Sequence, residues 1–447
     1  MYLERYALAT LPRYTSYPPA NRFDPAVDAG TYGGWLAGLE AASTLSLYVH
    51  VPFCRTLCWY CGCHTSVPND TDRVDRYVEL LMREIDLVAD RIGEGRPVVN
   101  LHFGGGTPTI LDPHSFLALS ARLRERFAFR PDAEVAVEVD PRGLDEARID
   151  ALAEAGVTRV SLGVQDLDPQ VQRAINRIQP FGTVARAVTG LRRAGIMAIN
   201  ADLMYGLPHQ TVQHVEASAR AVALLGVDRV AVFGYAHVPW FKANQRAIDE
   251  AALPGPEQRF EQAEAAARVL DAKGYDAIGF DHFARPDDPL AVAAATGRLR
   301  RNFQGYVVDP ADAILGFGAS SIGSLPQGYI QNEAHLKRWA QRVDAGELPV
   351  ARGIAVDGDD RLVRAAIERV LCDGAADLAR VADAVGTPVD NLSDAFRRLR
   401  ALEADGLVVL HGWTLRCTGL GRRYLRNVAA CFDPALDAAP GRHSRAV

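Results

Sequence analysis

Long apolar runs are missing from this chain of 447 residues. None reaches the roughly 18 consecutive residues that a membrane-spanning helix requires. The N-terminus, MYLERYALATLPRYTSYP, has neither the apolar core nor the small-residue cleavage site of a secretory signal. Hydrophobic residues still make up 48% of the chain, enough for a sizeable core. We therefore expect a cytoplasmic protein without a membrane span.

An excess of positive charge is also missing. Lys and Arg number 49 against 55 Asp and Glu, and the net charge is −6. A nucleic-acid-binding protein usually carries a distinctly basic face. Within residues 360–447, acidic residues nearly balance the arginines of RRLR and GRR. We expect no nucleic-acid partner, and a DNA-binding regulator is the least favoured interpretation. Nothing in the sequence requires an oligomer, so we expect a monomer.

Cysteine is scarce, with seven residues, and the chain is therefore no disulfide scaffold. Four of the seven lie in residues 54–63, called the cysteine loop below: Cys54, Cys58, Cys61 and Cys63. Three thiolates at the spacing C-x₃-C-x₂-C can bind an iron–sulfur cluster and leave one iron open for catalysis. Structural zinc bound by Cys54, Cys58, Cys61 and either Cys63 or His64 is the alternative. Zinc sites usually draw on two separated pairs, and the sequence has no second pair.

Apolar strand patterns alternate with helical patterns from about residue 45. Their near-continuous apolar character is typical of parallel strands that are buried on both faces. Right-handed βαβ connections make either a barrel or an open doubly wound sheet, and in both the active site lies at the carboxyl ends of the strands. The predicted strands are 45–51, 98–103, 133–139, 159–165, 198–204 and 229–235.

Ordered motifs run through nearly the whole chain. They are PRYTSYP (12–18), LYVHVPFC (47–54), HFGGGTPT (102–109), EVDPR (138–142), GVQD (163–166), DLMYGLP (202–208), FGYAHVPW (233–240), DHFARPDD (281–288), NFQGY (302–306) and CFD (431–433).

With the cysteine loop, these motifs resemble the radical S-adenosylmethionine (SAM) superfamily and, within it, the oxygen-independent coproporphyrinogen III oxidases. The resemblance implies an α/β fold with a partial (β/α)6 TIM-like barrel and a small helical, winged-helix-like C-terminal domain. We expect an N-terminal substrate-covering segment at 1–44, the barrel with its extension at 45–350 and the C-terminal domain at 351–447.

The resemblance also implies the cofactors. Cys54, Cys58 and Cys61 would bind a [4Fe–4S] cluster, and Cys63 would be a neighbour without a ligand role. SAM would complete the cluster site, with two molecules expected. The first would contact Tyr48, Gly105, Glu138 and Ile322, and the second Tyr60, Gly106, Thr107, Gln165, Arg177, Asp202 and Ala236.

The implied reaction turns two propionates of coproporphyrinogen III into vinyl groups by way of a 5′-deoxyadenosyl radical, giving protoporphyrinogen IX. It needs an electron donor and acceptor that the sequence does not identify. No protein side chain is expected to carry the radical. Guanidinium groups suit carboxylates, so Arg13 and Arg285 are substrate candidates, and Tyr14 and Tyr17 are candidates to cover a flat tetrapyrrole. The alternatives are a haem chaperone-like homologue without oxidase activity and a different radical enzyme.

Overall fold

The computed structural model describes residues 1–308 and 311–436. Its centre is a sheet in which six successive strands pair in parallel, each with the next along the chain. The α/β fold and the six predicted strands are confirmed. The strands are β1 (Leu45–Val51), β2 (Pro97–Gly105), β3 (Ala128–Val139), β4 (Arg159–Gln165), β5 (Ala198–Tyr205) and β6 (Arg229–Gly234).

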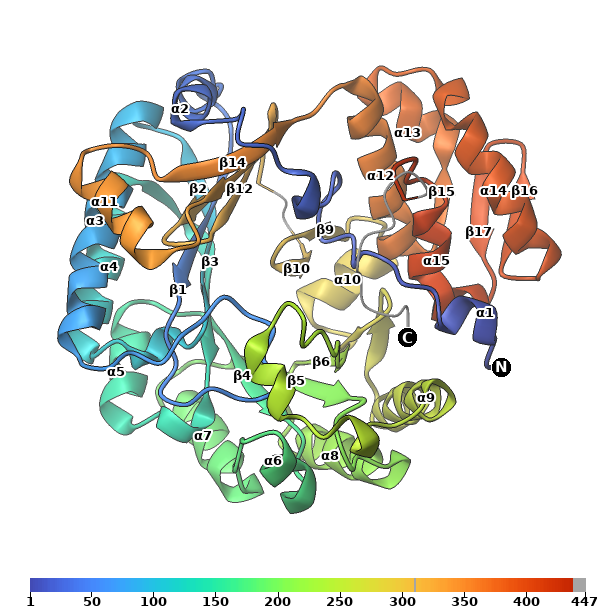
Figure 1. Cartoon of the computed structure of the whole chain (residues 1–447), viewed down its shortest axis with the longest axis horizontal. Coiled ribbons are helices and arrows are strands. Elements are labelled where there is room, and N and C mark those ends of the chain that lie inside the picture. The colour runs from blue at the N-terminus through green and yellow to red at the C-terminus, as the bar shows by residue number, and fades with distance from the viewer. Residues whose placement is uncertain (309–310, 437–447) are drawn as a thin grey trace.

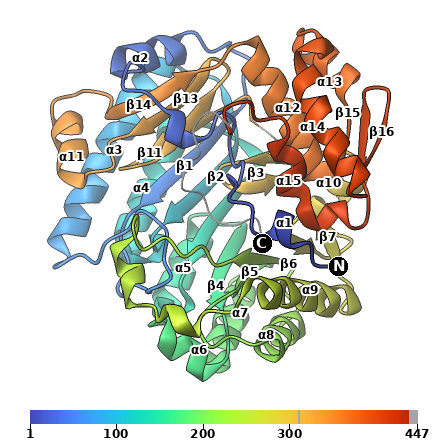
Figure 2. The ribbon, with the colours of Figure 1, turned by 45° about the vertical axis from the view of Figure 1, so that its right-hand side comes forward.

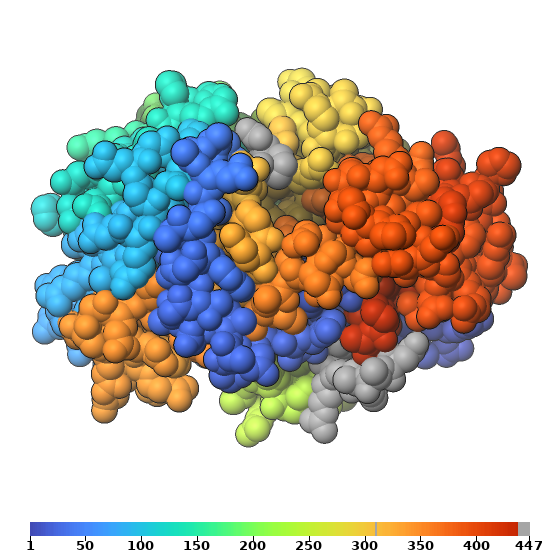
Figure 3. Space-filling model, turned by 90° about the horizontal axis from the view of Figure 1, so that it is seen from above, coloured from blue at the N-terminus to red at the C-terminus, as the bar shows by residue number. Residues whose placement is uncertain are grey.

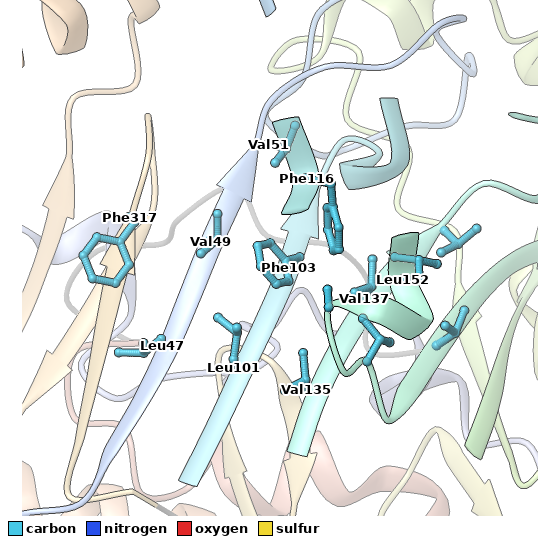
Figure 4. Close-up of a cluster of buried hydrophobic side chains, with 14 of the residues drawn as sticks. Leu47, Val49, Val51, Leu101, Phe103, Phe116, Val135, Val137, Leu152 and Phe317 are labelled. Atoms are coloured by element: carbon cyan, nitrogen blue, oxygen red, sulfur yellow. The ribbon is translucent and has the colours of Figure 1, made fainter. Parts of the chain in front are cut away.

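Side chains on these strands alternate between two environments, as the pleat requires. On β1, Leu47, Val49 and Val51 are fully buried in the core under the helices, as Figure 4 shows. The intervening residues, Tyr48 and His50 among them, point to the inside of the barrel. The outward positions therefore hold the fold together, and the inward positions are available for chemistry.

Helices cover the outside of the parallel strands (Figure 1). Side-chain caps begin several of them, as where Asp112 accepts a hydrogen bond from the backbone N–H of Ser115. The helices are α3 (Asp72–Ile92), α4 (Pro113–Arg126), α5 (Glu146–Glu154), α6 (Pro169–Ala174), α7 (Phe181–Arg193), α8 (Val212–Leu224) and α9 (Pro256–Ala272).

The sheet continues beyond both ends of the six strands and does not close, so the barrel is partial. Beside β1, one further parallel strand, β11 (Ala313–Phe317), leads to antiparallel β12 (Ile322–Leu325), β13 (Gly328–Asn332) and β14 (Val350–Ala355). Beside β6, the antiparallel strands β8 (His282–Ala284) and β7 (Asp276–Ile278) form the other edge. Between these edges lie α10 (Pro289–Ala295), the hairpin β9 (Arg300–Asn302) and β10 (Gly305–Val307), and α11 (Leu336–Asp344) follows β13.

The C-terminal region packs around a second hydrophobic core, to which N-terminal residues and Phe260 of α9 also contribute, and lies beside the barrel (Figures 1 and 2). Its helical character is confirmed, and a small sheet in the order β15-β17-β16 accompanies the helices. Residues 437–447 lie outside the described residues. The elements are α12 (Gly358–Asp373), β15 (Ala375–Asp377), α13 (Leu378–Val385), α14 (Ser393–Ala404), β16 (Val408–His411), β17 (Thr414–Cys417) and α15 (Leu425–Ala430).

The N-terminal residues join the two parts. Helix α1 (Glu4–Ala7) packs beside α15, where Asn427 donates a hydrogen bond to the carbonyl of Tyr6. From there the chain passes to α2 (Ala29–Ala37) at the barrel, and Figure 3 shows it as a blue band between the barrel helices and the C-terminal region. None of the helices in the described part of the chain is long and apolar enough to span a membrane.

Candidate active site

The cysteine loop leaves β1 at its carboxyl end and borders a cavity of about 580 Å³, called the mouth cavity below. Four cysteines line it: Cys54 and Cys61 are half-buried, Cys58 is buried and Cys63 is exposed. Ligand sites are commonly about 300–1,000 Å³. The loop therefore presents its thiols to a space of the right order for a cofactor.

Hydrogen-bond donors surround two of the sulfur atoms. Thr65 donates to Cys54 Sγ at 3.3 Å, and the Thr107 hydroxyl lies 3.5 Å from the same sulfur. Arg177 Nη1 and Arg142 Nη2 lie 3.4 and 3.6 Å from Cys58 Sγ. Hydrogen bonds to ligand sulfurs tune the potential of an iron–sulfur cluster. The donor set therefore fits a cluster held by thiolates.

Asp140 holds both of those arginines in place. Its carboxylate accepts from Arg142 at 2.6 Å and from Arg177 at 3.1 Å. Burial alone would raise the pKa of Asp140, but the hydrogen bond from Arg142 and the charge of Arg177 hold it below its usual value. The carboxylate thus stays ionised and keeps two cations next to Cys58.

The glycines of HFGGGTPT make a turn that packs against the start of the cysteine loop. The N–H groups of Gly106 and Thr107 donate to the carbonyls of Val51 and Phe53. A Cβ on Gly106 would lie 2.5 Å from the Phe53 carbonyl oxygen, and Gly105 has φ +115°. Larger residues do not fit here. The turn places Gly105, Gly106 and Thr107 on the wall of the mouth cavity.

Inward-facing residues of β1, β2 and β3 form a connected polar wall. Glu138 accepts hydrogen bonds from Gly105 N at 3.2 Å and from His102 Nε2 at 3.1 Å. The Tyr48 ring stacks on His102, and its hydroxyl lies 3.0 Å from His50 Nδ1. His50 Nε2 lies 3.0 Å from a carbonyl oxygen, that of His64, so Nε2 carries the proton and Nδ1 accepts from Tyr48. Burial lowers the pKa of His50 to about 4.

Asp202 lies on the floor of the mouth cavity. Its carboxylate accepts from Ser161 Oγ at 3.0 Å and from Asn200 Nδ2 at 2.8 Å. Burial raises the pKa of Asp202 to about 6, above the usual 3.8. A half-buried carboxylate whose hydrogen-bond donors are neutral is suited to a ligand that brings its own positive charge.

The structure brings most of the predicted site residues together. Ile322 and Tyr48 both lie next to Gly316 of β11. Gly316 pairs with Tyr48 of β1, and a Cβ added to Gly316 would lie 2.8 Å from the Ile322 carbonyl oxygen. Arg13 reaches the cavity from the N-terminal segment and donates to Gly234 O at 2.8 Å. The predicted residues that line the mouth cavity are Arg13, Cys54, Cys58, Tyr60, Cys61, Gly105, Gly106, Thr107, Glu138, Gln165, Arg177, Asp202 and Ala236.

Three substrate candidates lie elsewhere. Tyr14 and Tyr17 are 4% and 2% exposed and border a different, small pocket, and Tyr14 donates to Asp433 Oδ2 at 3.2 Å. Arg285 places its guanidinium 5.0 Å from the centre of the Tyr275 ring, and its backbone N–H donates to Asp228 O. The structure therefore does not bring these three side chains to the mouth cavity.

Several residues of the site were not singled out from the sequence, among them Arg142, Lys242, Asn244 and Gln245. Arg142 belongs to the EVDPR motif, and its place one turn after a strand end was an available signal. The other three follow FGYAHVPW, where no pattern marks them. Their side chains contact the cysteine loop from the segment after β6.

Comparison with known proteins agrees with this geometry. The radical SAM superfamily profile matches residues 48–222. Among curated proteins, the chain is 50% identical over 442 residues to the oxygen-independent coproporphyrinogen III oxidase of Bradyrhizobium diazoefficiens, covering 99% of this chain and 98% of that one. It is 40% identical to the enzyme of the same name from Escherichia coli, over 95% and 93% of the two chains.

A solved structure gives the same result. The Escherichia coli coproporphyrinogen III oxidase, described as a radical SAM enzyme, superposes with a TM-score of 0.91 at 38% identity, covering 95% of this chain and 98% of that one. Fold and site thus define a radical SAM protein. Within that class, the chain belongs to the family of oxygen-independent coproporphyrinogen III oxidases.

Proposed function

We propose that the chain catalyses the oxygen-independent oxidative decarboxylation of coproporphyrinogen III to protoporphyrinogen IX in haem biosynthesis. The single observation that carries this proposal is the mouth cavity, which joins four cysteine thiols, the strand-end carboxylates of Glu138 and Asp202, and Arg13 in one space. Membership of the oxidase family over almost the whole chain supports the same function.

Cys54, Cys58 and Cys61 would hold the [4Fe–4S] cluster, and Cys63 would lie beside it without a ligand role. When bound together with SAM, the cluster would supply the radical chemistry that removes hydrogen from a propionate. The protein's own part is to hold the thiolates, with Arg142 and Arg177 donating to Cys58, and to shield the cavity from water.

We further propose two SAM sites in the mouth cavity. Glu138 is half-exposed at the cavity and accepts from Gly105, which leaves carboxylate capacity for ribose hydroxyls. Asp202 offers a carboxylate to a cationic group. The first site would comprise Tyr48, Gly105, Glu138 and Ile322, and the second Tyr60, Gly106, Thr107, Gln165, Arg177, Asp202 and Ala236.

Arg13 is the proposed contact for a substrate propionate, because it is the N-terminal guanidinium at the cavity. We propose that residues 1–44 cover the substrate, 45–350 form the barrel and its extension, and 351–447 support the N-terminal segment. The enzyme would act as a cytoplasmic monomer with separate electron donor and acceptor. Light scattering tests the monomer.

The activity test is an anaerobic assay of the reconstituted protein with coproporphyrinogen III, SAM and a chemical reductant. We expect protoporphyrinogen IX and about two 5′-deoxyadenosines for each product, since two propionates react. Cys58→Ser is the inactive control. Cleavage of SAM without any vinyl product would refute the oxidase function, and tight haem binding in that case would favour the chaperone-like alternative.

A further inference from the structure

The cysteine loop has little regular backbone pairing of its own, yet its carbonyl groups are not left to water. Side chains from two other parts of the chain donate to them: Asn176 before α7, and a cluster in residues 242–245 after β6. His50 on β1 donates to the carbonyl of His64, directly after the loop. The loop carbonyls that accept are those of Leu57, Cys58, Trp59, Tyr60, Cys61 and Cys63.

Asn244 is the centre of this arrangement. Its Nδ2 lies 3.0 Å from the carbonyl oxygen of Cys61, 3.1 Å from that of Trp59 and 3.3 Å from that of Cys58. The amide oxygen cannot occupy this position, because it would face three acceptors. One side chain, more than 180 positions away in sequence, therefore fixes the turn that carries two of the proposed ligands.

Gln245 connects the same turn to the end of β6. Its side chain is 1% exposed, and its Nε2 donates to Tyr60 O at 2.9 Å and to Ala236 O at 3.2 Å. Its Oε1 accepts from Val238 N at 2.6 Å. Lys242 adds a bond from Nζ to Cys63 O at 3.0 Å. The 3₁₀ turn η4 (Ala243–Ala247) thus ties the cysteine loop to the segment that directly follows β6.

We propose that Asn244 and Gln245 are positioning residues that hold the cysteine loop in its ligand-presenting conformation before a cluster is inserted. A loop that is ordered in advance loses less conformational entropy when it binds. Only the second test below, which measures iron, depends on the cluster ligands assigned under the proposed function. The first test uses the metal-free chain.

The first test is amide hydrogen exchange of residues 54–66 in the reduced, metal-free protein. The N–H groups of Trp59 and Cys61 donate to Ile175 O and Cys58 O, so both should be protected in the wild-type chain. Asn244→Asp keeps the shape but turns a carboxylate toward carbonyl oxygens. We expect exchange of those amides to become at least about tenfold faster, given the cost of an unpaired group.

Arg246→Ala is the matched control, because Arg246 lies exposed on the same turn. It should leave the exchange unchanged. Unprotected amides in the metal-free wild type, or equal protection in Asn244→Asp, would overturn the proposal. If Asn244→Asp fails to fold by circular dichroism, Asn244→Ala removes the donor without adding charge and should show a smaller shift in the same direction.

The second test is the rate at which a chelator removes iron from the reconstituted protein under anaerobic conditions, without substrate. We expect Asn244→Asp to lose iron about tenfold faster than wild type and Gln245→Glu to lie between the two. Equal rates in all three proteins would contradict the inference. A wild type that binds no cluster would instead refute the proposed function, and the exchange test would still decide the inference.

Discussion

The barrel interior has two polar ends, which differ in whether their charged side chains form ion pairs. At the carboxyl ends of the strands, Glu138 and Asp202 face the mouth cavity. At the amino ends, Arg229 pairs with Asp288 at 2.8 Å and Arg159 pairs with Glu134 at 3.0 Å. Both sets stand on inward-facing strand positions or beside them.

The difference shows in the carboxyl groups. At the amino end, burial would raise the pKa of Glu134, but the charges of Arg159 and Arg229 outweigh it and lower the pKa. At the mouth, burial raises the pKa of Asp202 to about 6, and its described hydrogen-bond donors, Ser161 and Asn200, are neutral. Paired charges stabilise the amino end, whereas a carboxylate without a cationic partner at the mouth costs stability, as expected of a group that pairs with the proposed ligand.

The largest expected effect comes from a substitution at the mouth cavity that leaves the ion pairs of the amino end intact. Cys58→Ser removes a proposed cluster ligand, so iron and sulfide content and SAM cleavage should fall to background. The free energy of unfolding of the metal-free chain should change by less than about 1 kcal/mol. Cys63→Ser is the matched control and should keep iron at the wild-type level. A Cys63→Ser protein without iron would contradict the division into three ligands and one neighbour.

The second prediction concerns a substitution that removes an ion pair at the amino end and leaves the mouth cavity unchanged. Asp288→Ala leaves the buried Arg229 guanidinium without its 2.8 Å partner and should lower the free energy of unfolding by about 3 kcal/mol. Urea denaturation measures it. Asp132→Ala is the control, because that carboxylate is 70% exposed and should matter by less than about 0.5 kcal/mol. Equal effects of the two substitutions would show that the amino-end pairs do not stabilise the fold.

The sequence predicted the parallel strands and the mouth because both depend on local patterns. Apolar runs with short connections define strands such as β1 and β4, and residues directly after a strand must emerge at its carboxyl end. That rule placed Glu138, Gln165 and the glycine turn correctly at one edge of the sheet. The cysteine spacing and the ordered motifs supplied the family, which the comparisons confirm.

The rule that residues after a strand emerge at the carboxyl end of the sheet fails where the strand is antiparallel. Arg285 follows β8, which runs antiparallel to β6 and sets Ala284 opposite Arg229. Its side chain therefore leaves the sheet at the amino end. Asn244 was not predicted because its role depends on contacts across more than 180 positions of sequence, and an asparagine in an irregular segment carries no periodic signal.

A third prediction tests the mouth wall with a smaller effect. Glu138→Ala removes the acceptor of the Gly105 N–H and His102 Nε2 bonds and a proposed ribose contact. The Kd for SAM should rise about tenfold, the value of one or two hydrogen bonds, with iron content unchanged. Anaerobic calorimetry of the reconstituted protein measures it. An unaltered Kd would remove Glu138 from the proposed first SAM site.

The smallest expected effect is that of Asp202→Asn, which should change stability and SAM binding in opposite directions. The pKa of Asp202, about 6, lies above the usual 3.8, so between these values the folded chain holds a proton that the unfolded chain releases. Stability therefore falls as the pH rises through this window and stays lower above about pH 6. Asp202→Asn lacks the carboxylate and should unfold about 2 °C higher than wild type at pH 8.

The two proteins should unfold alike at about pH 4, where the wild-type carboxyl is protonated in the folded chain. In the wild type, we expect SAM affinity to increase between pH 5 and 8 as the Asp202 carboxyl ionises. The Asp202→Asn variant should not show this increase, because it has no carboxylate. Greater stability together with weaker SAM binding would mark Asp202 as a group kept at the mouth for a ligand. A variant that is less stable at pH 8 would place Asp202 with the paired, structural charges of the amino end.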